Sequence, residues 1–402
     1  MLELGPIVRM LWRNKMGVAL VAVQMAVALA IISNAAFVIH ERRQLIARPT
    51  GVAEAEVFGL AVMALRPEPR PYALVQRDLE AIRALPGVIE ASFSSQFPLS
   101  GSGSSTTFKT DDVKRPIEGQ ANYFYTNERG LDALGLKLIA GRNFRPEEML
   151  QSRNTSDDEP QVIIVSKALG EQMFGAGVEP VGRQILSGSH RLEVIGVVDP
   201  FLGSWVDWEY VGHTALLPVH IIDAPIRYIV RSHAEQRARL MTEVPDLLRQ
   251  LDPERVVLSA RAMDELKARS YRADSAMIRT LSTAIVLLTA VTALGIGGLT
   301  LFWVGQRRRQ IGTRRALGAS RAAILRLLLV ENSLISALGL ALGLVLALVV
   351  NQLMVEHYQM TALPPSYLLV TLGLLWLCAT LSALAPAWRA TTIPPAVATR
   401  CA

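Results

Sequence analysis

Four long apolar segments constrain the fold of this chain more than any other feature of its sequence. A helix that crosses the hydrocarbon core of a bilayer needs about 20 predominantly apolar residues. The four segments contain no lysine or aspartate, and Glu331 is their one acidic residue. They lie at residues 16–39, 281–304, 327–350 and 367–387. The sequence therefore predicts an α-helical membrane protein with four transmembrane helices, plus a large α+β domain inserted between the first and the second.

The net charge of +6 is distributed unevenly along the chain. Residues 41–280 carry a net charge of −3, whereas the remaining residues, which include the apolar segments, carry +9. Lysine and arginine beside apolar spans are typical of the cytoplasmic sides of membrane proteins. Because no basic surface interleaved with aromatic residues remains, we expect no nucleic-acid partner.

The positions of the basic residues also predict the orientation of the chain. Seven arginines lie between residues 305 and 326, three basic residues precede the first span, and loop 351–366 has none. The first apolar run exceeds the roughly 7–15 residues of a signal-peptide core, so we expect it to remain as an anchor. The predicted segments are a cytoplasmic N-terminus (1–15), TM1 (16–39), a periplasmic domain (40–280), TM2 (281–304), a cytoplasmic loop (305–326), TM3 (327–350), a short periplasmic loop (351–366), TM4 (367–387) and a cytoplasmic tail (388–402).

The predicted periplasmic domain, at about 240 residues, is long enough to form its own core. It contains no cysteine, so we expect no disulfides. Two stretches, about 54–100 and 224–262, each read as strand, helix with apolar residues at helical spacing, and strand. We interpret them as a weak internal duplication whose halves form one split βαβ subdomain.

Between these halves, residues 101–223 predict a mixed subdomain of short strands with one short helix. From residue 262 the pattern stays helical into the second span, without Pro or Gly before Gly295. We therefore expect a stalk helix at 262–280 that continues without interruption through TM2. A break at the membrane interface is the alternative.

No arrangement of residues in the sequence predicts catalysis. The chain has no Walker A motif and no Gly-x-Ser-x-Gly elbow, and its six histidines lack metal-binding spacing. The acidic pairs lie in polar loops, where solvated charge is the better interpretation. We therefore expect a non-enzymatic chain without a metal or cofactor of its own.

The segment "RRRQIGTRRALGASRAAIL", residues 307–325, holds six arginines and no acid. It predicts a short basic helix over 305–317, ended by Gly318, followed by a new helix with Ser320 as its N-cap. The arginines either keep the loop on the cytoplasmic side of the membrane and contact anionic lipids, or form a docking surface for a cytosolic protein. Charge alone leaves both open. The candidate docking residues are Arg307, Arg308, Arg309, Ile311, Gly312, Arg314, Arg315, Ala316, Leu317, Gly318, Ala319 and Ser320.

Two further features lie in the third apolar segment. Glu331 is the fifth residue of this segment, near one end, where a charge costs less than the roughly 2.5–3.5 kcal/mol of the bilayer centre. Pairing with a loop arginine is its simplest role, and coupling is the alternative. Gly339 and Gly343 form a Gly-x-x-x-Gly motif that lets helices pack closely, either within the chain or at a dimer seam.

The stretch "RRRQIGTRRALGASRAAILRLLLVEN" closely resembles the FtsX-like permease domain of ABC transporters of the MacB type. The matching positions are Ile311–Gly312, Arg314–Arg315, Ala316 to Ser320, and Glu331. The tail "APAWRATTIPPAVATR" is similar to the end of that domain. "NYFYTNERGLDALGLKLIAGRNF" and "VSKALGEQMFG" look like the family's periplasmic core domain. One position departs: Gln310 stands where the family usually has Glu.

The resemblance implies a coupling helix seated on a cytosolic ABC ATPase dimer that binds ATP and magnesium. It implies an inner-membrane permease dimer of identical or paralogous chains, with a two-part periplasmic region that meets an adaptor and an outer-membrane channel in tripartite members. Such systems transmit motion to drive export, here of a peptide, toxin or lipid-like substrate. Two alternatives stay open: an FtsX-like regulator of cell-wall hydrolases and a LolC/LolE-like lipoprotein-release permease.

Overall fold

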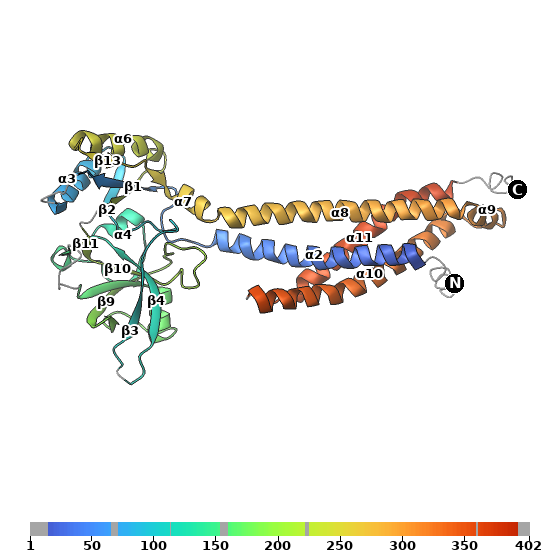
Figure 1. The fold of residues 1–402 in the computed structure, drawn as a ribbon, viewed down its shortest axis with the longest axis horizontal. Coiled ribbons are helices and arrows are strands. Elements are labelled where there is room, and N and C mark those ends of the chain that lie inside the picture. Colours follow the sequence, from blue (N-terminus) through green and yellow to red (C-terminus); the bar gives the residue numbers. More distant parts are fainter. Residues whose placement is uncertain are drawn as a thin grey trace. The chain divides into compact units, whose positions relative to one another are not determined.

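The computed structural model describes residues 15–65, 71–112, 114–152, 160–221, 225–358 and 361–392. The chain divides into two compact units. One, the α+β unit, comprises Arg48–Ala273, and the other, the helical unit, comprises the residues before and after it. Figure 1 shows the fold and labels many of the elements of both units.

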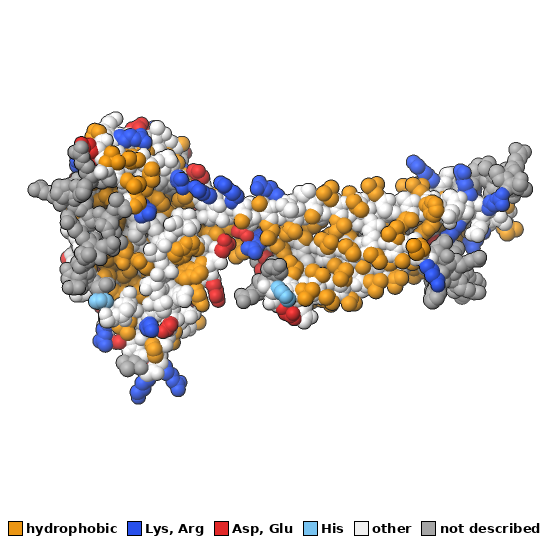
Figure 2. Space-filling model, viewed as in Figure 1, with side chains coloured by type: hydrophobic (Ala, Val, Ile, Leu, Met, Phe, Trp, Pro, Cys, Tyr) orange, Lys and Arg blue, Asp and Glu red, His pale blue; other side chains and the backbone are white. Residues whose placement is uncertain are grey.

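Long helices make up the helical unit (Figure 1). Four of those described are long and apolar enough to cross a membrane. Hydrophobic side chains cover much of their visible surface in Figure 2, as expected for helices surrounded by lipid. The helices of the unit are α2 (Lys15–Ala47), α8 (Arg272–Gln306), α9 (Arg308–Ala316), α10 (Arg321–Tyr358) and α11 (Pro365–Thr391).

Helices α2 and α10 pack at close range through small residues. A Cβ atom added at Gly339 would lie 2.8 Å from the Ala22 carbonyl oxygen, and one at Gly343 would lie 2.8 Å from Ala26 Cα. Asn34 Nδ2 extends this contact by donating a hydrogen bond of 3.2 Å to the carbonyl oxygen of Ala347. The Gly-x-x-x-Gly motif therefore serves a contact within the chain, which is one of the two uses that the sequence left open.

Polar side chains join the other helices of this unit. Asn332 on α10 donates to the carbonyl oxygen of Ala379 on α11 at 3.2 Å. Gln24 on α2 donates to the carbonyl oxygen of Val291 on α8 at 3.0 Å. In an apolar surrounding each such hydrogen bond fixes the register of two helices, because the alternative is an unsatisfied amide.

The first sheet of the α+β unit combines strands from two distant chain segments. Its order is β13–β1–β12–β2, with β14 also paired to β1. Strand β12 runs antiparallel to both β1 and β2, so the two strand–helix–strand halves interleave. We call this sheet the split sheet. Its elements are β1 (Val57–Ala64), α3 (Pro71–Arg83), β2 (Val88–Phe93), β12 (Ile226–Ser232), α6 (Arg237–Leu251), β13 (Arg255–Val257) and β14 (Arg261–Ala262).

Helices α3 and α6 bury their apolar faces in one core with the split sheet, which includes Phe58, Leu79 and Leu240. A fully buried ion pair lies within this core. Arg255 donates to both carboxylate oxygens of Asp78, and the Tyr228 hydroxyl donates to Asp78 at 2.7 Å. The pair links α3 of the first half to β12 and β13 of the second.

The second sheet is closed. Its order is β5–β9–β7–β10–β4–β3–β8, and β8 also pairs with β9, so six of its strands form a ring. A separate parallel pair joins β6 and β11. The strands are β3 (Ser105–Thr110), β4 (Glu118–Tyr125), β5 (Leu138–Gly141), β6 (Leu150–Ser152), β7 (Val162–Ser166), β8 (Gln184–Ser187), β9 (His190–Val198), β10 (Thr214–Leu217) and β11 (Val219–Ile221).

The mixed part contains more helix than the single short one expected. Besides α5 (Lys167–Phe174) it has α4 (Gly130–Leu134) and a 3₁₀ turn at Pro146–Glu148. The expectation of one helix is wrong because α4, with five residues, is too short to show a helical period in sequence.

The helix expected to run without interruption from residue 262 through the second apolar segment is also interrupted. It consists of α7 (Met263–Ser270) and α8, which begins at Arg272. Tyr271 between them has φ −90° and ψ 18° and is almost completely buried in the α+β unit. The expectation of one continuous helix is therefore wrong: the interruption coincides with a buried tyrosine, which the absence of Gly and Pro could not reveal.

Candidate functional site

The basic segment folds as a short helix with defined ends. Helix α9 begins at Arg308 rather than at residue 305 as expected. Gly305 and Gln306 belong to the end of the preceding helix, α8. It ends at Ala316 with Leu317 as its C-cap, and Gly318 follows with φ +95°, a left-handed conformation that glycine adopts without a steric penalty. The Ser320 hydroxyl accepts a hydrogen bond from the Ala323 N–H at 3.2 Å and caps α10.

One face of α9 is fixed to the helical unit. Ile311 and Gly312 are buried, although the residues around them are largely exposed. The Ile311 side chain packs into an apolar cluster formed by the ends of α8, α10 and α11. A displacement of α9 would therefore act on all three helices. The other members of the cluster are Val304, Ile324, Leu325, Leu328, Ala387 and Ala390.

The opposite face of α9 is exposed and basic. Arg308, Arg309 and Arg314 are exposed, and Leu317 at the helix end is 83% exposed. Figure 2 shows lysine and arginine side chains gathered at the end of the helical unit where Figure 1 places α9. A positive helix with an exposed leucine suits an acidic protein surface that has an apolar pocket.

Arg307, immediately before α9, forms an ion pair with Glu331 on α10. Its Nη1 donates to Oε1 at 2.8 Å and to Oε2 at 2.9 Å. The Arg307 and Glu331 side chains are 13% and 4% exposed. Glu331 is thus paired with a loop arginine. That arginine is not the nearby Arg326, which is exposed, but one lying 24 residues earlier.

The remaining candidate positions lie on α9 or in the turn that follows it. Arg315 is partly buried, whereas Ala316 and Gln310 are exposed on α9. Ala319 lies in the turn, where its N–H donates to the Arg314 carbonyl oxygen at 3.0 Å. The candidate residues from Arg307 to Ser320 therefore form one structure, α9 and its two ends, while Gly339 and Gly343 lie in the α2–α10 contact.

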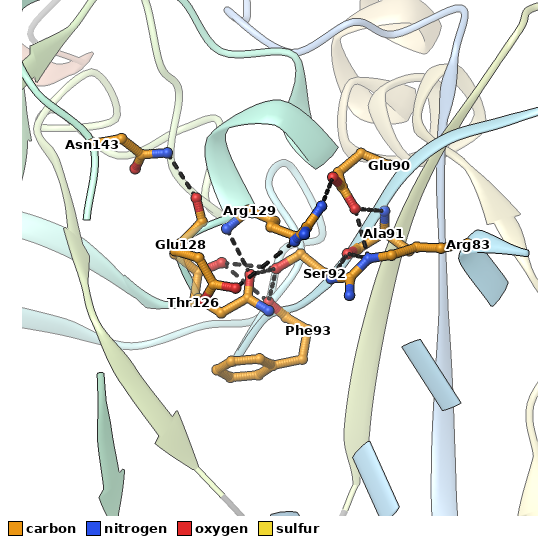
Figure 3. Close-up of polar contacts among 10 residues, drawn as sticks. Arg83, Glu90, Ala91, Ser92, Phe93, Thr126, Glu128, Arg129 and Asn143 are labelled. Carbon is orange, nitrogen blue, oxygen red and sulfur yellow. Dashed lines mark hydrogen bonds and ion pairs between the residues drawn. The ribbon is translucent and has the colours of Figure 1, made fainter. Parts of the chain in front are cut away.

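A second polar site, which no sequence pattern predicted, lies in the α+β unit (Figure 3). Glu90 on β2 accepts hydrogen bonds from Arg83 at 2.6 Å and from Arg129, which precedes α4, at 2.8 Å. Ser92 donates to Asn127 Oδ1 at 2.7 Å in the same region. These contacts fix the split sheet against α4, and the residues that meet belong to different elements, so no single local pattern joins them.

Electrostatics favour the ionised form of Glu90. Burial alone would raise the pKa of this carboxyl group. Hydrogen bonds from Arg129 and from the Ala91 N–H, together with the positive charge of Arg83, outweigh burial and leave the pKa below its ordinary value. In the described ranges no group of three or more His, Cys, Asp or Glu residues is placed to hold a metal ion.

Two family models match the chain and together cover most of it. Residues 16–266 match the MacB-like periplasmic core domain, and residues 282–395 match the FtsX-like permease C-terminal domain. The first match alone covers more than half of the chain. The boundary between the two matches lies near the start of the apolar part of α8.

Curated relatives carry export-related names. The Macrolide export ATP-binding/permease protein MacB of Acinetobacter baylyi is 24% identical over 286 residues, covering 70% of this chain and 40% of the relative. The protein of the same name from Chromobacterium violaceum is 27% identical over 270 residues, which cover 64% of this chain and 39% of the relative. A Probable export ATP-binding/permease protein of Pseudomonas fluorescens is 22% identical, and the match covers 64% of this chain and 38% of the relative. The chain spans about two fifths of the length of these relatives.

Among solved structures, the periplasmic region of MacB from Actinobacillus actinomycetemcomitans is similar, with 14% identity and a TM-score of 0.35, covering 56% of this chain and 97% of that one. The extracellular domain of the ABC-type transporter YknZ from Gram-positive bacteria has 16% identity and a TM-score of 0.32. The match covers 50% of this chain and 100% of that domain. The family matches are the stronger finding. This chain belongs to the MacB-like family of ABC transporter permeases, with a MacB-like periplasmic core domain followed by an FtsX-like permease domain.

Proposed function

We propose that this chain is the permease subunit of a MacB-type ABC exporter and that α9 is its coupling helix. A separate cytosolic ATPase dimer, which binds ATP and magnesium, would press on the exposed basic face of α9. The chain's own part is mechanical: it passes the displacement to its periplasmic domain. The observation that carries the proposal is the structure of α9, whose outer face is exposed and basic while its inner face is fixed by Ile311 and Arg307.

The proposal includes an orientation and a set of partners. Four helices would cross the inner membrane, with both termini and α9 in the cytoplasm and the α+β unit in the periplasm. A second permease chain, identical or paralogous, would complete the dimer, and an adaptor with an outer-membrane channel would receive the substrate. The substrate would be a peptide, a toxin or a lipid-like molecule. The match to the MacB-like periplasmic core supports this exporter over a hydrolase regulator or a lipoprotein-release permease.

Charge reversal on α9 tests the coupling role. With Arg314→Glu and Arg315→Glu together, we expect normal membrane insertion but loss of ATPase co-purification and of export. The matched control is Arg183→Glu with Arg191→Glu, two exposed arginines of the α+β unit that change the net charge equally. Full export by the α9 variant would refute the docking role.

Labelling tests the orientation independently of any partner. Thr313 is exposed on α9 and can be replaced by cysteine in a chain whose Cys378 and Cys401 are replaced by serine. A membrane-impermeant maleimide should label this cysteine only after cells are opened. Labelling in intact cells would place α9 outside and would contradict the proposal.

A further inference from the structure

Arg48 and Tyr271 occupy the two places where the chain passes between its units. Arg48 is the first residue of the α+β unit and follows Ala47, the last residue of α2. Tyr271 lies just before Arg272, the first residue of α8. Although 223 positions separate them in sequence, the two side chains meet inside the α+β unit.

Their contact combines three interactions of one guanidinium group. Arg48 Nε donates to the Tyr271 hydroxyl at 2.9 Å, and the Arg48 Cζ atom lies 5.7 Å from the centre of the Tyr271 ring. Arg48 Nη2 donates to the carbonyl oxygen of Val206. Tyr271 is only 2% exposed, so separation of the two would leave a buried hydroxyl without its partner. A lysine could not make these contacts together, because its ammonium group lacks the planar fork.

The segment around Val206 ties this contact to the rest of the unit. We call residues 199–206 the strap. The Leu202 N–H donates to the carbonyl oxygen of Thr50 at 3.0 Å, next to the chain that leaves α2. The Ser204 N–H donates to Asn122 Oδ1 at 2.7 Å, on β4 of the closed sheet. The strap therefore connects the chain that enters the unit with the sheet.

The chain that leaves the unit is held by the same strap through a residue in an unusual conformation. The Ser270 hydroxyl donates to the carbonyl oxygen of Leu99. Leu99 is fully buried and has φ +56°, a left-handed conformation that is uncommon outside glycine, asparagine and aspartate. Its N–H donates to the carbonyl oxygen of Gly203 in the strap at 3.0 Å.

We propose that Arg48 and Tyr271 form a clasp that makes the chain leaving α2 and the chain entering α8 move together with the strap. This inference rests on the proposed function and assigns both residues a positioning role in it. A displacement that reaches either α2 or α8 is then passed to the closed sheet through Thr50, Leu99 and Asn122. Without the clasp, the two chain segments can shift separately and the displacement is dissipated.

Hydrogen exchange on the full-length chain tests the clasp without any partner. With Arg48→Lys or Tyr271→Phe, we expect the amides of Leu202, Gly203 and Leu99 to exchange at least tenfold faster, while those of β12 keep their rates. The control is Arg227→Lys, another partly buried arginine that donates to a backbone carbonyl, at Ser95. If the strap amides exchange at wild-type rates in both clasp variants, the clasp does not exist.

Export with the cognate ATPase in vesicles tests the positioning role. We expect Arg48→Lys to retain ATPase activity and lose at least tenfold in export, whereas Tyr228→Phe, which removes a buried hydroxyl elsewhere in the unit, changes export less than twofold.

In a chain without other cysteines, Arg48→Cys with Tyr271→Cys should lose export and regain it when a short bifunctional thiol reagent joins the pair. Wild-type export by Arg48→Lys, or no recovery on crosslinking, would overturn the role. An ATPase that fails to bind the wild-type chain would instead refute the proposed function, and the exchange result would still decide whether the clasp exists.

Discussion

Arg307 places one guanidinium nitrogen within 2.9 Å of both carboxylate oxygens of Glu331. The pair joins the start of the basic helix α9 to α10, in a position where both side chains are largely removed from solvent. A buried carboxylate of this kind persists only when a partner compensates its charge. The ion pair and the Ile311 contact together hold α9 and its start against the ends of α8, α10 and α11.

The first prediction concerns this ion pair. Arg307→Gln removes the guanidinium group and leaves Glu331 buried without a counter-charge, which should lower the free energy of unfolding by about 3–5 kcal/mol. Thermal unfolding of the purified chain in detergent would show this as a lower midpoint. The double variant Arg307→Gln with Glu331→Gln should recover most of the loss, because no unpaired charge remains. Equal losses in the single and double variants would contradict the pairing.

The second prediction concerns the α2–α10 contact. Gly343→Leu would force a side chain into Ala26 and should destabilise the helical unit by about 1–3 kcal/mol or more. Gly373→Leu, at a glycine with no atom within 4 Å of an added Cβ, is the matched control and should be tolerated. The midpoint of thermal unfolding in detergent measures this destabilisation. At a protein concentration where the chain is monomeric, a loss of stability reports the contact within the chain and not a dimer interface. Equal tolerance of both substitutions would mean that Gly343 is not packed within the chain.

Features that depend on neighbouring residues could be predicted from the sequence. The end of α9 at Gly318 and the cap at Ser320 follow from local backbone chemistry, which does not require tertiary information. The four apolar helices follow from composition over about 20 residues. The two strand–helix–strand halves could also be predicted, because in each half apolar residues at helical spacing lie between two strand-like stretches.

Features that depend on distant residues could not be predicted in this way. The sequence suggested a loop arginine for Glu331 but could not select Arg307 over the closer Arg326, because the choice depends on how α9 folds back onto α10. The helix is interrupted at Tyr271, whose side chain is buried against distant parts of the chain, and no residue nearby signals that burial. Glu90 and its arginines come from three separate elements, so no local pattern joins them.

The third prediction concerns Glu90 and pH. Because the pKa of this carboxyl group is lower in the folded chain than its ordinary value of 4.5, its stabilising effect is fully present at neutral pH. That effect is lost as the pH falls from 4.5 through the folded-state pKa. Glu90→Gln should cost about 1.5–3 kcal/mol at pH 7 and should reduce the additional loss in acid. Hydrogen exchange of the β2 and α4 amides between pH 7 and pH 4, corrected for intrinsic rates, measures both effects.

A control separates the Glu90 contact from general acid sensitivity. Glu118 pairs with Lys109 at the surface, where both side chains are about half exposed. Exposed pairs contribute little, roughly 0–1 kcal/mol, so Glu118→Gln should leave the same amides almost unchanged. A Glu90→Gln chain with wild-type exchange at pH 7 would show that the contact does not hold the split sheet against α4.

The fourth prediction concerns the buried Asp78–Arg255 pair. Arg255→Met leaves the Asp78 carboxylate in the core with the Tyr228 hydroxyl as a hydrogen-bond donor and with the half-exposed Arg77, 3.7 Å away, as an ion-pair partner. Because Arg77 compensates the buried charge only in part, the substitution should lower the free energy of unfolding by about 3 kcal/mol. Asp78→Leu with Arg255→Met should lie closer to wild type, because two apolar side chains of similar size replace the pair. Tyr228→Phe should cost only about 1 kcal/mol.

The titration of Tyr228 provides an independent measurement of the same core. Burial, and then the negative charge of Asp78, raise the pKa of the Tyr228 phenol well above its ordinary value of 10.0. Its ultraviolet signal, identified by difference from Tyr228→Phe, should therefore stay constant through the pH range in which exposed tyrosines ionise. Ionisation of Tyr228 in step with exposed tyrosines, while the chain is still folded, would mean that the Asp78–Arg255 pair is open to solvent.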